Sequence, residues 1–109
     1  MTEEQPVFRA IADPTRRAIL AHLAVEELTI AQLVTRFDVT RGAIKKHLVI
    51  LEEGGVISVQ TRGRERVNRL EANALRDVAD WVDGFSRFWD DRLMKLKQAV
   101  EAEERENGE

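Results

Sequence analysis

Residues 29–53 contain two apolar patterns with helical spacing, and only three residues separate the two helices that these patterns predict. The first pattern follows the i, i+3, i+4, i+7 order of an amphipathic helix, at Ile30, Leu33, Val34 and Phe37. The second repeats with the same period, at Ile44, Leu48 and Leu51. Residues 38–40 lie between them, and Thr40 is a suitable N-cap for the second helix. Two short helices joined by so tight a turn predict a helix-turn-helix.

The outer face of the second predicted helix is basic, although the chain as a whole is acidic. The formal net charge is −3. Residues 36–70 nevertheless hold eight Lys or Arg against four Asp or Glu, while the segments on both sides carry more acidic than basic residues. Charge acts through its distribution as well as through its sum, so the middle of this chain is suited to an anionic partner.

Local signals place further helices before the helix-turn-helix. A short helix is expected at residues 6–11. Asp13 and Pro14 form a strong start signal for a second helix, which should run to about Leu23 with its apolar face inward. Thr29 is the expected N-cap of the third helix, which should end near residue 37.

A β-hairpin is expected after the basic helix. Gly54 and Gly55 should end that helix. Residues 56–62 and 65–70 are rich in β-branched residues and partly alternate, and Gly63 between them is a turn residue. This pattern predicts two antiparallel strands with basic residues beside the tip.

Residues 72–104 predict a long C-terminal helix with one apolar seam. The seam has spacings of three and four, at Leu75, Val78, Val82, Phe85, Trp89, Leu93, Leu96 and Val100. Trp81 and Phe88 widen it, and Gly84 marks a bend. A small domain cannot cover so long a seam alone, so we expect a second copy of the chain to bury it in a homodimer. The aromatic stripe has an alternative interpretation as the lining of a ligand pocket.

The composition narrows the possible chemistry. The chain has no cysteine and two histidines, which excludes a disulfide framework, thiolate ligands and a thiol nucleophile. It also lacks a Gly-rich phosphate loop and a paired-carboxylate motif, so we do not expect an enzyme. No segment has the pattern of a secretory signal or a membrane span, and we expect a cytoplasmic protein of one domain with no membrane partner.

Four segments together resemble the ArsR-type (ArsR/SmtB) winged-helix repressors. They are A-D-P-T-R-R-A-I-L at 12–20, E-L-T-I-A-Q-L at 27–33, A-I-K-K-H-L-V-I-L at 43–51 and G-R-E-R-V-N-R-L at 63–70. The segment F-W-D-D-R-L-M-K-L at 88–96 is similar to a subgroup of that family that lacks the metal sites. The resemblance spans most of the chain.

The resemblance implies a mainly α fold with a small β-hairpin. Residues 1–71 would form a winged helix-turn-helix DNA-binding domain, and residues 72–109 would form a long dimerisation helix packed on the same domain. The implied function is that of a homodimeric, sequence-specific repressor of transcription whose partner is double-stranded DNA. Residues 40–47 would enter the major groove, and the hairpin would reach the flanking backbone or minor groove.

The residue types suggest a division of roles on that surface. Arg41 is the candidate for base readout, because Arg bonds bidentately to guanine, and Gly42 permits close approach. Contacts to the DNA backbone are expected from Lys45, Lys46, Arg62, Arg64 and Arg66. Thr40 and His47 are expected to donate hydrogen bonds to phosphates. For Arg16 and Arg17 we favour structural ion pairing over DNA contact.

Metal regulation is not expected. In the family, a thiolate pair occupies the positions of Thr29 and Ala31, and neither of these side chains can hold a soft metal. The C-terminal helix has no histidine, so the family's other common site is also missing. We therefore expect no metal and no cofactor, and the sequence identifies neither an inducer nor an operator. The alternative function is a winged-helix protein-interaction module that does not bind DNA.

Overall fold

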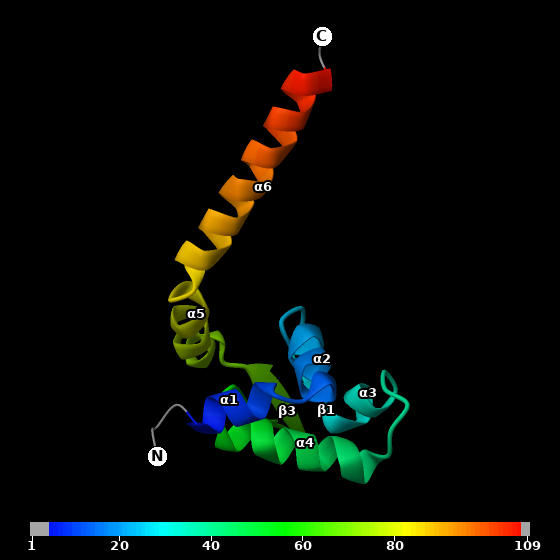
Figure 1. Cartoon of the computed structure of the whole chain (residues 1–109). Helices are drawn as coiled ribbons and strands as arrows, with labels where there is room; N and C mark the ends of the chain where they lie inside the picture. The colour runs from blue at the N-terminus through cyan, green and yellow to red at the C-terminus, as the bar shows by residue number, and fades with distance from the viewer. Residues whose placement is uncertain (1–4, 108–109) are drawn as a thin grey trace. The chain divides into compact units, whose positions relative to one another are not determined.

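The computed structural model describes residues 5–107, which form helices and one small sheet (Figure 1). The chain divides into two compact units between Val78 and Ala79. The elements, in order, are α1 (Gln5–Ile11), α2 (Pro14–Leu23), β1 (Leu28–Thr29), α3 (Ile30–Val34), α4 (Arg41–Glu53), β2 (Ile57–Arg62), β3 (Glu65–Leu70), a 3-10 turn (Ala72–Leu75), α5 (Arg76–Asp83) and α6 (Ser86–Asn107).

Side-chain caps fix the starts of the three helices in the middle of the first unit. Asp13 caps α2 and is followed by a proline in the first turn. Thr29 and Gln32 form a reciprocal capping box at α3, with N···O distances of 2.8 and 3.2 Å. The Thr40 hydroxyl accepts from the backbone N–H of Ala43 at 3.1 Å at the start of α4. All three predicted N-caps are confirmed.

The core of the first unit lies where α2, α3 and the inner face of α4 meet the sheet. Its fully buried large side chains are Ile19, Leu28, Leu33, Ile44, Leu51 and Val56. The inward positions predicted for α2 and α4 are therefore confirmed. Phe37 lies beyond the end of α3, which stops at Val34, earlier than predicted. Its ring packs against the core and contacts the His22 ring edge-on, with centroids 5.3 Å apart.

The described sheet has three antiparallel strands in the order β1-β3-β2. The predicted hairpin is β2 and β3, with Gln60 opposite Val67, and Gly63 takes a positive φ of 64° at its turn. The sequence did not predict β1, whose Leu28 pairs with Asn68. A two-residue strand has no period to detect, because it exists only through its distant partner.

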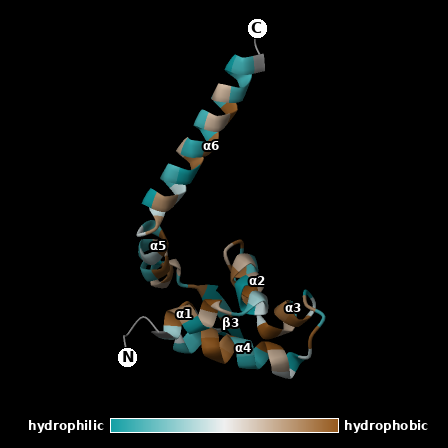
Figure 2. Cartoon of the chain, viewed as in Figure 1, coloured by the Kyte–Doolittle hydropathy of each residue, from teal (hydrophilic) through white to brown (hydrophobic). Residues whose placement is uncertain are grey.

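The predicted C-terminal helix is divided in the structure. A 3-10 turn and α5 precede α6, which spans 22 residues. Gly84 lies at the break, and its N–H donates to the carbonyls of Asp80 and Trp81. Figure 2 shows apolar and polar residues alternating along α6. No helix of the described residues is long and apolar enough to cross a membrane.

Candidate nucleic-acid interface

The solvent-facing side of α4 carries the predicted DNA-reading residues. Arg41, Gly42, Lys45 and Lys46 are all exposed, while Ile44, Leu48 and Leu51, which follow one another at spacings of four and three, are buried. This contrast follows from the helical period, because residues three and four apart share a face. The buried face fixes α4 to the core, and the basic face remains free for a partner.

The start of α4 adds to the attraction for anions. Its first backbone N–H groups have no partner within the helix, and the helix dipole places partial positive charge there. The Thr40 hydroxyl oxygen already accepts a hydrogen bond from Ala43. Its proton therefore remains available for donation, and this geometry is compatible with the predicted phosphate contact.

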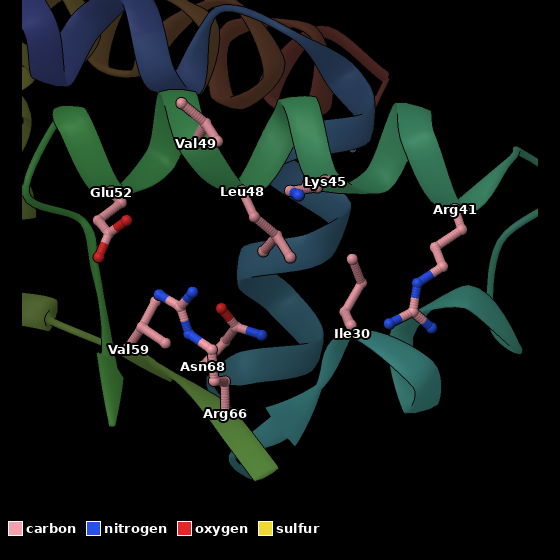
Figure 3. A pocket seen from close by; sticks show the side chains of 9 residues that line it. All are labelled: Ile30, Arg41, Lys45, Leu48, Val49, Glu52, Val59, Arg66 and Asn68. Atoms are coloured by element: carbon pink, nitrogen blue, oxygen red, sulfur yellow. The ribbon is translucent and has the colours of Figure 1, made fainter. Parts of the chain in front are cut away.

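The helix and the hairpin share one groove, of about 270 Å³ (Figure 3). Arg41 and Lys45 line it from α4, and Arg66 lines it from β3. Aliphatic side chains and two polar residues complete the lining: Ile30, Leu48, Val49, Glu52, Val59 and Asn68. Asn68 is buried, and its amide N–H donates to the carbonyl of Leu28 at 3.1 Å, which ties the groove to β1. The fold thus brings basic side chains from α4 and β3 together in one groove.

Arg62 differs from the other predicted wing contacts. Its guanidinium nitrogen Nη2 lies 3.0 Å and 2.9 Å from the two carboxylate oxygens of Glu27. Glu27 directly precedes β1, and β3 separates β1 from β2, so the pair spans the width of the sheet. Arg64 lies in the turn and Arg66 lies in β3, and both are exposed. Arg62 therefore joins the tip of the hairpin to the body of the first unit.

Arg16 and Arg17 act on the end of α1. Arg16 donates to the carbonyls of Ala10 at 2.8 Å and Arg9 at 2.9 Å, and Arg17 donates to the carbonyl of Ile11 at 2.8 Å. These are the carbonyls that a helix leaves without partners at its C-terminal end. Ion pairing was expected, but the structure shows backbone carbonyls as the acceptors for these guanidinium groups.

His47 is less accessible than its place on the basic helix suggested. Its Nδ1 lies 3.2 Å from Nη1 of Arg16 and 4.0 Å from Oδ2 of Asp13. The imidazole therefore connects α4 to the start of α2. Sequence reasoning missed this connection, because nothing local to His47 indicates a neighbour 31 positions away.

Asp13 is held in its charged form. The backbone N–H of Arg16 donates to its carboxylate at 3.0 Å, and this bond is the largest cause of a pKa lowered from the ordinary 3.8. The charge of Arg16 acts in the same direction, as does that of His47 when its ring is protonated. The capping interaction is thus strongest when the carboxyl group is ionised.

The second unit presents an exposed aromatic patch, formed by Trp81, Val82, Phe85, Phe88 and Trp89. These five side chains line a hollow of about 300 Å³. The exposed fractions of Phe88 and Trp89 are 68% and 62%. The seam continues along α6 through further exposed residues, Leu93, Met94, Leu96 and Val100.

Leu75 differs from the other predicted seam residues. It packs against the core of the first unit instead of facing solvent, because the chain there is a 3-10 turn rather than the start of the long helix. Val78 is half-buried. The apolar surface that is open to a partner therefore begins at Trp81.

Comparisons with known proteins agree with this fold. The pattern of a helix-turn-helix domain family matches residues 11–60. The transcriptional repressor SdpR of Bacillus subtilis (strain 168) is 34% identical over 87 residues, which are 80% of this chain and 97% of that protein. A solved ArsR-like transcriptional regulator from Rhodococcus sp. RHA1 superposes with a TM-score of 0.69 at 35% identity, covering 88% of this chain and 91% of that one. The chain belongs to the ArsR family of winged helix-turn-helix regulators. The family resemblance predicted from the sequence is confirmed.

A further relative extends the match across this ArsR-family chain. The HTH-type transcriptional regulator Rv2034 of Mycobacterium tuberculosis is 31% identical over 96 residues, 88% of this chain and 87% of the relative. The family and the fold of the chain are therefore those of a DNA-binding regulator of transcription.

The described part of this ArsR-family chain contains no cluster of three or more His, Cys, Asp or Glu side chains that could hold a metal ion. Thr29, which stands where the family has a thiolate, uses its hydroxyl oxygen to cap α3.

Proposed function

We propose that this ArsR-family protein is a homodimeric transcriptional repressor that reads an inverted-repeat operator. In this proposal, α4 enters the major groove and the β2–β3 hairpin is the wing. The observation that carries the proposal is the shared groove, where Arg41 and Lys45 of α4 and Arg66 of β3 face one hollow. An α-helix fits the major groove, and cations on both sides of it can neutralise the flanking phosphates.

The contacts divide by chemistry. Arg41 is the proposed base reader, since its guanidinium can bond bidentately to guanine, and Gly42 lets the DNA approach. Lys45, Lys46, Arg64 and Arg66 are the proposed backbone contacts. Thr40 and His47 are the proposed phosphate donors. We assign Arg62 a different role, because its guanidinium is already bound by Glu27: it holds the wing tip in place.

The aromatic patch supports dimerisation. A contiguous patch that includes Trp81, Phe85, Phe88 and Trp89 is larger than the scattered apolar residues that monomers usually expose. A second copy of the chain would bury it, with the seam at Val82, Leu93 and Leu96 continuing the interface. Dimers of helix-turn-helix proteins read half-sites whose centres are one helical turn, about 10 bp, apart. Repression as the outcome follows the relative SdpR, which is named a repressor.

Selection from random duplex DNA tests the proposal. The full chain is incubated with a random pool, and bound sequences are amplified over several rounds. We expect enrichment of an inverted repeat with half-site centres about 10 bp apart. Recovery of no duplex above background would overturn the proposal and favour the protein-interaction function instead. Enrichment of a single half-site would contradict the dimer.

A further inference from the structure

The contact between Arg16 and His47 fixes which ring nitrogen carries the proton. Nη1 of Arg16 lies 3.2 Å from Nδ1 of His47. A guanidinium group has only donors, so Nδ1 must accept in this contact. A neutral imidazole that accepts at one nitrogen carries its proton on the other. Neutral His47 is therefore protonated at Nε2.

Arg16 is itself held firmly enough to impose this choice. Its Nε and Nη2 donate to the carbonyls of Ala10 and Arg9, at 2.8 and 2.9 Å. Its backbone N–H donates to Asp13 at the start of α2. The guanidinium group is thus bound to the end of α1 while its third nitrogen faces the imidazole. Because the guanidinium group is planar, two hydrogen bonds through Nε and Nη2 fix the direction in which Nη1 can donate.

The other ring nitrogen remains open to solvent. No described residue bonds to Nε2 of His47, and no described buried side-chain nitrogen or oxygen lacks a partner, so Nε2 is not buried. The His47 side chain is 21% exposed. On α4 it lies between buried Leu48 and exposed Lys46, at the margin of the basic face. Its Nε2–H is therefore available to an acceptor outside the protein.

We infer that Arg16 is a positioning residue for DNA binding, which holds His47 in the tautomer that donates from Nε2 to a phosphate of the DNA backbone. This inference rests on the proposed function and deepens it. Arg16 does not touch DNA; it acts through the imidazole. Phosphate oxygens only accept hydrogen bonds, so a ring with an unprotonated Nε2 would lose the contact.

The neighbouring carboxylate makes the role of Arg16 testable. Oδ2 of Asp13 lies 4.0 Å from the same Nδ1. With Arg16 present, Nδ1 accepts from the guanidinium group. Without Arg16, Asp13 is the remaining neighbour, and a carboxylate attracts a protonated Nδ1. Removing the guanidinium group should therefore shift the proton from Nε2 toward Nδ1.

Nitrogen-15 NMR of the histidine side chains in the free protein measures the tautomer directly. At a pH where the ring is neutral, we expect His47 to show a protonated Nε2 and an unprotonated Nδ1. Arg16→Met should increase the fraction protonated at Nδ1. Arg17→Met is the matched control, since it removes a similar bond to the end of α1, to the Ile11 carbonyl, without contacting His47. The same tautomer in the wild type and in Arg16→Met would overturn the inference.

DNA affinity tests the consequence on the selected operator. His47→Gln can keep a donor near the position of Nε2, whereas the shorter side chain of His47→Asn cannot. We expect His47→Asn to weaken binding by about tenfold, the equivalent of one hydrogen bond to a charged acceptor, and His47→Gln to weaken it less. Arg16→Met should lose as much as His47→Asn, and the double variant should lose no more than either alone. Arg17→Met should bind like the wild type.

Wild-type affinity in His47→Asn would contradict the phosphate role of His47, and additive losses in the double variant would contradict the positioning role of Arg16. His47→Asn keeps Arg16 and the end of α1 intact, so it decides the question even if Arg16→Met does not fold. If the wild type binds no duplex, the proposed function and the phosphate role fail together. The spectrum of the free protein still decides the tautomer, so the two failures are distinguishable.

Discussion

The glycines near the two ends of α4, Gly42 and the C-cap Gly54, differ in what surrounds them. A Cβ atom on Gly54 would lie 2.7 Å from the carbonyl oxygen of Pro6 and 3.0 Å from the Cβ of Ala10, so the glycine allows α1 to approach the end of α4. A Cβ atom on Gly42 would meet only Thr40 Oγ1, at 3.9 Å. Gly54 is therefore required by packing, whereas Gly42 faces the proposed DNA surface.

Gly54→Ala should lower the free energy of unfolding by about 1–3 kcal/mol, the usual cost of overpacking, because backbone atoms of α1 must move. Gly42→Ala is the control for stability and should be neutral or slightly stabilising, by up to about 1 kcal/mol, since alanine favours a helix. Urea denaturation measures both. Equal stability of the two variants would show that α1 does not pack closely on Gly54.

Asp13 should make stability depend on pH in acid. Its folded pKa lies below the ordinary 3.8, so its stabilising effect is fully present above that value and is lost as the pH falls through the folded pKa. Asp13→Asn keeps a capping oxygen but does not titrate. The wild type should therefore lose stability more steeply than Asp13→Asn below about pH 4, as thermal melts at several pH values can measure. Parallel curves would contradict the capping role of the ionised carboxylate.

At the scale of elements, the sequence predicted helix starts correctly because the capping interactions that fix them are local. Asp13, Thr29 and Thr40 cap helices through bonds to residues three positions away, so the sequence alone predicted these helix starts. It missed β1, because that strand depends on pairing with β3 some 40 residues later. The early end of α3 was missed because Phe37 continues the apolar period although it lies in a turn.

In the candidate site too, the sequence predicted local features but not contacts between residues that are distant in the chain. The exposed face of α4 followed from its period and charge. The internal partners of Arg62 and His47 did not, since they lie 35 and 31 positions away. Charge alone cannot distinguish an arginine that contacts DNA from one that holds the wing.

Exchanging the charges of Arg62 and Glu27 tests whether Arg62 contacts DNA or holds the wing in place. Arg62→Glu alone should weaken DNA binding, because it places two carboxylates together and releases the tip. Adding Glu27→Arg should restore affinity and its salt dependence if the pair positions the wing. If Arg62 instead contacts a phosphate, the double variant should stay weak, with a salt slope reduced by about one phosphate per subunit. Arg64→Glu is the control and should not be rescued by Glu27→Arg. Unfolding stability should change little, by about 0–1 kcal/mol, since the pair is exposed.

At the scale of the whole molecule, the apolar surface of the second unit is the basis of the proposed dimer. Trp81, Phe88 and Trp89 are each more than half exposed. Burial of such side chains contributes much of the stability of protein interfaces, and the patch continues along α6. The first unit has its own core, so dimerisation would use a surface that folding leaves open.

Sedimentation equilibrium at micromolar concentration should give twice the chain mass of 12.5 kDa. Trp89→Glu should shift the protein to monomer, because a carboxylate in an apolar interface has no partner. Val25→Glu is the matched control: Val25 is 81% exposed but lies outside the patch, so this variant should remain dimeric. A monomeric wild type would remove the basis for two-fold operator reading.

The most direct test of the account is the affinity of three proteins for the selected operator and a scrambled duplex, measured at several salt concentrations. The wild type should prefer the operator. Arg41→Ala should lose about 1–3 kcal/mol on the operator and relax the preference at one position of each half-site. Lys46→Ala should weaken binding to both duplexes and reduce the salt slope by about one phosphate per subunit. If the wild type binds both duplexes equally, or if Arg41→Ala behaves like Lys46→Ala, then α4 does not read bases through Arg41.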